Sequence, residues 1–184
     1  MIYSWERMSS KISQQWAVFA RMWYLIDATK QPPGRIAKAV KPILEGRHKP
    51  IYHPLSDVGD HVVIINTYHI AFSKDKWRTK IYKHHTGYPG GYSETPAYRM
   101  HEKDSTIIVK KAIYGMLPKD LRRHDMMKRL HLFPDENIPD DIRANICEQI
   151  KPPREIPKAL PEYSEEEQAA FPRLWLPKDS EVKR

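Results

Sequence analysis

The sequence has a single cysteine, Cys147, and only seven glycines among its 184 residues. One thiol excludes an intramolecular disulfide and any zinc site built on cysteines, so the fold does not need an oxidising compartment. Long hydrophobic runs are also missing, since no apolar segment approaches the roughly 20 residues of a membrane-spanning helix. Three of the glycines fall within residues 84–91, HHTGYPGG. This concentration indicates a stretch of backbone whose conformation matters.

The motifs of nucleotide-binding and hydrolytic enzymes are missing as well. Neither G-x-x-x-x-G-K-[ST] nor G-x-G-x-x-G occurs, so the glycine-rich stretch lacks the residues and spacing of a phosphate-binding loop, and there is no G-x-S-x-G nucleophile elbow. His84 and His85 are adjacent, but neighbouring residues of a strand point to opposite faces and cannot easily share one metal ion. Asp27, Asp57 and Asp60 are more simply acids of loops and turns than a general acid–base pair. The sequence therefore predicts no catalysis, no metal and no cofactor.

Charge is distributed unevenly along the chain, which carries a net +8 at pH 7. Residues 70–131 hold 14 Lys/Arg against 6 Asp/Glu, whereas residues 132–184 hold 8 against 12. A middle segment this basic suits a polyanion, because Lys and Arg neutralise phosphates and release their counterions. The acidic end is repelled by bare RNA, and we expect it to meet protein neighbours or to face the matrix instead.

Hydrophobic patterns predict an α/β fold with a mostly parallel central sheet flanked by helices. Trp23–Ala28 and Asp60–Asn66 have the length and the apolar runs of buried strands. Ile70–Ser73 and Lys80–His84 are two further strand candidates. After the first strand, apolar residues at helical spacing predict a helix over residues 36–46, which ends at a glycine.

Proline and aspartate mark the expected ends of the other helices. Pro42 lies inside the first helical pattern and predicts a kink or an early stop there. Asp104 is the expected N-cap of a second helix, and Pro118 is expected to open a third. Beyond Phe133, prolines punctuate two short helical candidates, Asp140–Ile150 and Ser164–Phe171.

These patterns divide the chain into three parts. Residues 1–20 are expected to be an N-terminal arm, residues 21–136 an RNA-binding α/β core domain, and residues 137–184 an acidic, proline-rich C-terminal extension that wraps a surface. The first 25 residues contain Arg, Lys and Ser and only one acid. This composition is compatible with a mitochondrial import signal and equally with a basic arm of the mature protein.

Basic residues recur next to glycine or aromatic residues in the middle of the chain. Flexible glycine lets backbone amides approach phosphates, while Trp77, Tyr82 and Tyr88 offer surfaces on which RNA bases stack. His84 and His85 are further donors in the same region. Several such clusters together favour a structured RNA partner.

Three segments resemble the large-subunit ribosomal protein 13 family: GDHVVIIN, the stretch from Lys76 through HHTGYPGG, and AIYGMLPKDLRRHDMMKRLHLF. The resemblance covers about residues 16 to 136. The acidic, proline-rich extension and the stretch QQWAVFARMWYL resemble the mitochondrial branch. The resemblance implies an α/β fold without catalysis, which binds large-subunit ribosomal RNA and helps to assemble the subunit.

Charge recurrence and the resemblance together predict the RNA contacts, of which Arg35 comes from the resemblance alone. The predicted contacts are Arg35, Arg47, His48, Lys49, Lys76, Lys80, Lys83, His84, His85, Thr86, Gly87, Gly90, Gly91, Lys111, Lys119, Arg122, Arg123, Lys128 and Arg129.

The sequence thus predicts a structural component of the mitochondrial large ribosomal subunit, located in the matrix. Its expected partners are large-subunit ribosomal RNA and, through the C-terminal extension, neighbouring ribosomal proteins, with no membrane span. Two alternatives remain open: a nucleotide- or RNA-processing α/β enzyme, and an RNA-binding regulator that acts off the ribosome.

Overall fold

The structure is a computed structural model that describes residues 21–54 and 56–171. The chain divides into two units, Met1–Arg154 and Glu155–Arg184. The expected N-terminal arm, residues 1–20, lies outside the described residues. The three-part division predicted from the sequence therefore stays a prediction.

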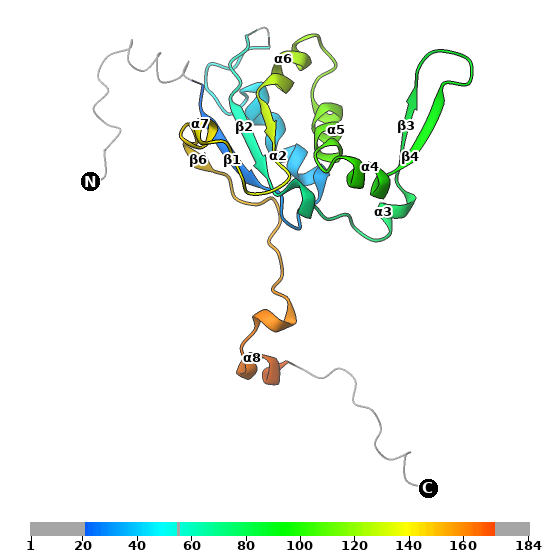
Figure 1. The fold of residues 1–184 in the computed structure, drawn as a ribbon. Helices are drawn as coiled ribbons and strands as arrows, with labels where there is room; N and C mark the ends of the chain where they lie inside the picture. The colour runs from blue at the N-terminus through cyan, green and yellow to red at the C-terminus, as the bar shows by residue number, and fades with distance from the viewer. Residues whose placement is uncertain (1–20, 55, 172–184) are drawn as a thin grey trace, which may run out of the picture. The chain divides into compact units, whose positions relative to one another are not determined.

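A four-stranded parallel sheet forms the centre of the first unit and confirms the predicted fold class (Figure 1). Its two central strands are the apolar runs that the sequence indicates, and Ile26 pairs in register with Ile64. Every pair of neighbouring strands in the sheet is parallel. In spatial order the strands are β5 (Leu130–Leu132), β2 (His61–Ile65), β1 (Trp23–Asp27) and β6 (Glu148–Gln149).

Helix α2 (Pro33–Glu45) follows β1 and ends at Gly46, as predicted. Proline at its first position fits a site where no backbone N–H is needed, and Gly46 closes the helix with a left-handed φ of 78°. The predicted early stop at Pro42 is wrong, because the helix continues to Glu45. The carbonyl of Pro42 accepts a hydrogen bond from Arg47 N at 2.8 Å, so the last turn stays closed.

Helix α5 (Ile107–Met116) packs against α2 and buries Ile108 and Ile113 in the core. The predicted cap at Asp104 is wrong by two residues, since the helix begins after Thr106. The Asp104 carboxylate instead accepts hydrogen bonds from the Thr106 amide and hydroxyl, at 2.8 and 2.7 Å. This closes a local turn just before the helix.

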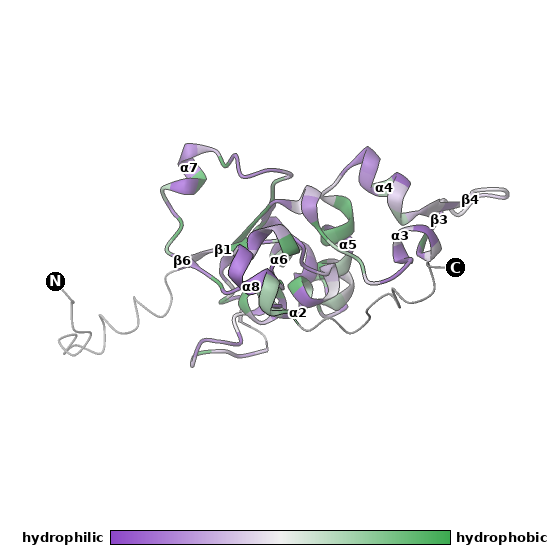
Figure 2. Ribbon diagram, turned by 90° about the horizontal axis from the view of Figure 1, so that it is seen from below, coloured by the Kyte–Doolittle hydropathy of each residue, from purple (hydrophilic) through white to green (hydrophobic). Residues whose placement is uncertain are grey.

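Helix α6 (Arg122–Lys128) is the third predicted helix, but it begins four residues after Pro118. A short helix, α4 (Ala97–Lys103), precedes α5. Hydrophobic residues gather on α5, whereas α3 (Lys76–Thr79) and α4 are largely hydrophilic (Figure 2). The core therefore lies between the sheet and the pair α2 and α5.

The predicted strand at Ile70–Ser73 is wrong. A 3₁₀ turn, η2 (Thr67–His69), follows β2, and the next residues run as irregular chain. Ala71 N donates to Gln31 O at 3.1 Å, so this segment is fixed to the loop after β1 and not to a strand of the sheet.

The predicted strand at Lys80–His84 exists, but it lies outside the central sheet. It is β3 (Ile81–His85), which pairs antiparallel with β4 (Tyr92–Pro96). The two strands form a separate hairpin that projects from the body of the first unit (Figure 1). Hairpin residues from Lys83 to Gly90 are all exposed.

The first part of the extension joins the core sheet. Only Asp140–Arg143 of the predicted helix over 140–150 is helical (α7), because the chain then extends into β6 and pairs with β1. In the second unit, η3 (Leu160–Glu162) precedes α8 (Glu165–Ala170), whose first turn is capped by the Ser164 hydroxyl. Across the part of the chain that the structure describes, no helix has both the length and the apolar character needed to cross a membrane.

Candidate nucleic-acid interface

The stretch HHTGYPGG forms the end of β3 and the tip of the hairpin. Gly87 and Gly90 have φ of +92° and +74°, conformations that side chains with a Cβ rarely adopt. At Gly91 a Cβ would lie 1.9 Å from the Thr86 hydroxyl oxygen and 3.0 Å from the Tyr88 carbonyl oxygen, so any other residue there would have to displace the Thr86 side chain. The Gly87 amide donates to Nδ1 of His85 at 2.8 Å, which leaves Nε2 of that ring as the exposed donor. The glycines thus shape an exposed tip of donors, as the sequence analysis expected of their conformation.

Lys83 is the basic residue of the hairpin itself. Its ammonium lies 3.4 Å from the Glu94 carboxylate and 5.9 Å from the Tyr92 ring centre. The Tyr92 hydroxyl raises the pKa of Lys83 and, by donating a hydrogen bond, lowers the pKa of Glu94. Both side chains are exposed, so the pair holds Lys83 only weakly and leaves it accessible to a polyanion.

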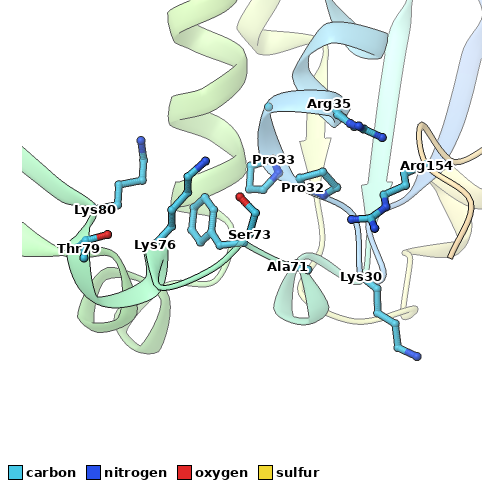
Figure 3. A pocket seen from close by; sticks show the side chains of 12 residues that line it. Lys30, Pro32, Pro33, Arg35, Ala71, Ser73, Lys76, Thr79, Lys80 and Arg154 are labelled. Carbon is cyan, nitrogen blue, oxygen red and sulfur yellow. The ribbon is translucent and has the colours of Figure 1, made fainter. Parts of the chain in front are cut away.

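A cavity of about 680 Å³ opens at the N-terminus of α2 and brings three predicted residues together. Lys76 and Lys80 lie on one side of it, while Arg35 lies on the other (Figure 3). Lys30 and Arg154 also line it, and the sequence analysis did not include them among the contacts. None of the described residues that line the cavity is acidic.

Tyr82 lies between Lys80, which lines this cavity, and Lys111 of α5. The ammonium groups of Lys80 and Lys111 each lie 5.3 Å from the centre of its ring. Burial raises the pKa of the Tyr82 hydroxyl, so the ring stays neutral at physiological pH. Contact with an aromatic face stabilises a cation, and both lysines remain exposed.

Lys119 lies in the turn between α5 and α6, and Arg122 and Arg123 are the first two residues of α6. Arg123 is half-buried: its guanidinium donates to the carbonyls of Leu117 and Pro118 at 2.9 and 2.8 Å and stacks on a tyrosine of α5. Those bonds satisfy carbonyls at the end of α5, so Arg123 has a structural task. Lys119 is exposed, and Arg122 forms a surface pair with Asp120 at 3.0 Å. Lys119 and Arg122 therefore remain the accessible cations of this α5–α6 region.

Arg129 is not available as an RNA contact, and we correct its place in the predicted set. Its side chain is only 4% exposed and donates to both Asp57 carboxylate oxygens at 2.7 Å and to Leu44 O at 3.1 Å. Lys128, one residue earlier, is 77% exposed and pairs with Asp125 at the surface. The sequence pattern Lys-Arg cannot tell which of the two faces inward.

The cluster after α2 is also largely committed to the fold. His48 and Lys49 both contact Asp60, whose carboxylate is fully buried. Arg47 contacts the buried carboxylate of Glu45, but its side chain is 56% exposed. A buried carboxylate needs such partners, so Arg47 is the member of this cluster with the most surface to offer.

The three acids considered for catalysis have internal partners. Burial alone would raise the pKa of Asp27, but hydrogen bonds from Thr29 and Asn66 outweigh it and lower the pKa. Asp57 forms an ion pair with Arg129, and Asp60 contacts His48 and Lys49. Within residues 21–54 and 56–171, no three His, Cys, Asp or Glu side chains come close enough together to hold a metal ion.

The predicted residues thus fall into separate groups and not into one patch. The groups are the hairpin from Lys83 to Gly91, the cavity with Lys111, the α5–α6 region with Lys128, and Arg47. Arg35 lies in the first turn of α2 and Arg47 two residues after the end of the helix, and the helical stretch between them, residues 35–45, is about 15 Å long at 1.5 Å per residue. Such spacing suits a ligand with phosphates repeated along its length.

The fold and these surfaces define an α/β binding protein whose exposed cations suit an extended polyanion. The profile of the family described as "Ribosomal protein L13" matches residues 21–139, and the chain belongs to this family. It is 49% identical to the large ribosomal subunit protein uL13m of Drosophila melanogaster over 171 residues, 92% of this chain and 96% of the relative. It is 42% identical to the large ribosomal subunit protein uL13 of Acholeplasma laidlawii over 113 residues, 61% of this chain and 80% of the relative. The resemblance seen in the sequence is confirmed.

Proposed function

We propose that the protein is a structural component of the mitochondrial large ribosomal subunit, where it binds large-subunit ribosomal RNA and supports subunit assembly and translation. The observation that carries this proposal is the 49% identity to the Drosophila uL13m, which covers 92% of the chain. The bacterial relative matches a shorter part, 61% of the chain. The match to uL13m therefore includes most of the extension, which favours the mitochondrial form.

The arrangement of exposed cations supports RNA as the ligand. The hairpin with Lys83, the cavity at the N-terminus of α2 and the α5–α6 region each present lysine or arginine to solvent. The cavity lining contains no acid, whereas Lys83 and Arg122 each have one carboxylate partner at the surface. Each single phosphate contact changes the logarithm of affinity by about 0.7 to 0.9 per decade of salt, so several groups acting together give strong, salt-dependent binding. Contacts to phosphates position a protein on folded RNA without reading its sequence.

The finer parts of the proposal concern the extension and the compartment. Residues 132–184 carry more acids than bases, so we assign most of their contacts to neighbouring ribosomal proteins. A role in the mitochondrial ribosome places the protein in the matrix. Intact mitochondria should then protect the chain from added protease until both membranes are dissolved.

Sedimentation of a mitochondrial lysate tests the function directly. A tagged chain should migrate with the large subunit on a sucrose gradient and return to the top of the gradient after ribonuclease treatment. The double variant Lys80→Glu/Lys111→Glu should enter the subunit poorly, whereas Lys151→Glu, an exposed lysine of the extension, should enter normally. A wild-type chain that stays at the top of an untreated gradient would contradict the proposal and favour a role away from the ribosome.

A further inference from the structure

The cavity at the N-terminus of α2 has the composition of a binding site for a phosphate next to a base. Five cations line it, from Lys30 to Arg154, and its volume of about 680 Å³ lies within the range of ligand sites. Its apolar lining includes Phe72, whose ring is fixed by an edge contact with Trp77 at 4.8 Å. A fixed aromatic ring among cations suits a nucleotide, because bases stack on such rings while phosphates meet the charges.

Arg154 reaches this cavity through a specific anchor. The side-chain amide of Gln31 donates to Arg154 O at 2.7 Å, and its oxygen accepts from Arg154 N at 3.0 Å. Gln31 is completely buried, so its two bonds replace water that its amide would otherwise need. The backbone of Gln31 is itself fixed by bonds to Ala28 and Ala71. One buried side chain thus sets the position of Arg154 beside the α2 N-terminus.

Arg154 belongs to the extension and not to the part of the chain that the family profile matches. The family profile ends at residue 139, so Arg154 lies beyond the part of the chain that the profile matches. Lys30, Arg35 and Lys76 lie within that part. The extension therefore adds a cation to a cavity that the matched part of the fold builds.

We propose that Arg154 is an RNA-contacting residue of the extension, which completes a cavity that receives a phosphodiester of the ribosomal RNA, and that Gln31 is its positioning residue. This inference rests on the proposed function for its ligand. It gives the extension a contact with RNA at one residue, although the rest of that segment is acidic.

Two neighbouring variants of the full-length protein test the contact. Arg154→Gln and Lys151→Gln each remove one positive charge from the same exposed segment, but Lys151 does not line the cavity. The probe is a fluorescein-labelled 20-residue uridine RNA, with binding followed by anisotropy at several salt concentrations. Arg154→Gln should weaken binding about fivefold at 0.1 M salt and reduce the slope of log affinity against log salt by about 0.7, because one phosphate contact is lost. Arg154→Lys should keep most of the slope.

A double-variant cycle tests the anchor. Gln31→Met removes both bonds to the Arg154 backbone with little change of volume, and thermal unfolding verifies that the variant is folded. If Gln31 acts through Arg154, Gln31→Met should reduce the slope in the wild type and have no further effect in Arg154→Gln. If the reductions in slope caused by Gln31→Met and Arg154→Gln added up in the double variant, the positioning role of Gln31 would be overturned.

The outcomes separate this inference from the proposed function. Equal slopes for Arg154→Gln and Lys151→Gln would overturn the Arg154 contact, while wild-type sedimentation with the large subunit would leave the proposed function standing. A wild-type chain that fails to sediment with the subunit would instead remove the function on which the inference rests.

Discussion

At the scale of the residue, neighbouring cations of the same charge have different tasks. Arg129 is buried, with its guanidinium on Asp57 and Leu44 O, whereas Lys128 projects into solvent. Removing Arg129 would leave the Leu44 carbonyl without its donor and Asp57 with Arg21 as its remaining arginine partner, whereas breaking the exposed Lys128–Asp125 pair changes little. Burial therefore decides which of two adjacent basic residues stabilises the fold and which can meet a ligand.

We expect Arg129→Met to lower the free energy of unfolding by about 2 kcal/mol, because it removes the donor to the buried Leu44 O and one of the two arginine partners of Asp57, which Arg21 still contacts at 3.1 Å. Lys128→Met should change the free energy of unfolding by less than about 0.5 kcal/mol. Denaturant unfolding of the two variants measures both values. The RNA affinity of folded protein should show the opposite order, with the larger loss in Lys128→Met. A stable Arg129→Met variant with a strong loss of RNA affinity would reverse the assignment.

Much of this residue-scale picture was beyond prediction from sequence. The sequence predicted Arg129 as an RNA contact, and it gave no signal for Lys30 or Arg154. Arg154 is brought to the cavity by Gln31, a residue 123 positions away. Contacts over such separations depend on how the chain folds back, which local patterns do not contain.

At the scale of the element, the hairpin differs from the other described strands of the first unit. Its strands β3 and β4 pair with each other alone, and its tip is exposed. An exposed hairpin buries little apolar surface, so its conformation contributes little to the stability of the core. Its glycines are better explained by the shape of the tip than by packing.

We expect replacement of residues 86–91 by Asn-Gly to separate binding from folding. The two-residue turn would join His85 and Tyr92, which are already register partners, and Asn-Gly favours the turn that such a hairpin needs. The midpoint of thermal unfolding should stay within a few degrees, while affinity for large-subunit RNA should fall several-fold. Calorimetry and filter binding measure the two quantities. Unchanged RNA binding would exclude the tip from the interface.

A second element-scale feature is a stack of three rings on the sheet. Trp23 lies on His61 with ring centres 4.1 Å apart, and on His131 at 5.0 Å. Burial lowers the pKa of both histidines, so the folded protein favours their neutral forms. For a histidine whose pKa is lower in the folded state, the unfolded chain binds protons first as pH falls.

The free energy of unfolding should therefore decrease as pH falls from 8 through the ordinary histidine value of 6.5, and this decrease should end below the lowered pKa of the folded state. His131→Phe keeps a ring in the stack and removes one titrating group, so its decrease between pH 8 and pH 5 should be smaller. Urea unfolding at each pH provides the measurement. If the free energy of unfolding of the wild type and of His131→Phe changed equally with pH, His131 would not contribute to the pH dependence.

At the scale of the whole molecule, the sequence predicted the fold class and the family, because those depend on long apolar runs and on several motifs in a fixed order. Both central strands, the first helix and its glycine end are confirmed. The errors concern places where tertiary contacts decide. The apolar run 70–73 has the length of a strand, yet Ala71 is hydrogen-bonded to the loop after β1. Residues 148–149 were predicted to be helical, but they form a strand that pairs with β1.

The same scale explains why the site could be predicted only in part. Charge recurrence located the basic middle of the chain, but it could not divide those residues between internal ion pairs and accessible surface. His48 and Lys49 are held by the buried Asp60, whereas Lys80 and Lys111 keep their ammonium groups exposed beside Tyr82. Only the folded chain makes that division.

The most direct test of RNA binding by these surfaces is a high-resolution structure of the assembled mitochondrial large subunit that contains this chain. We predict phosphate oxygens of ribosomal RNA within hydrogen-bond distance of the hairpin tip at 86–91 and of the cavity formed by Arg35, Lys76 and Lys80. Both surfaces facing solvent or protein alone, with no nucleotide near either, would contradict the claim that the hairpin tip and the cavity hold folded RNA.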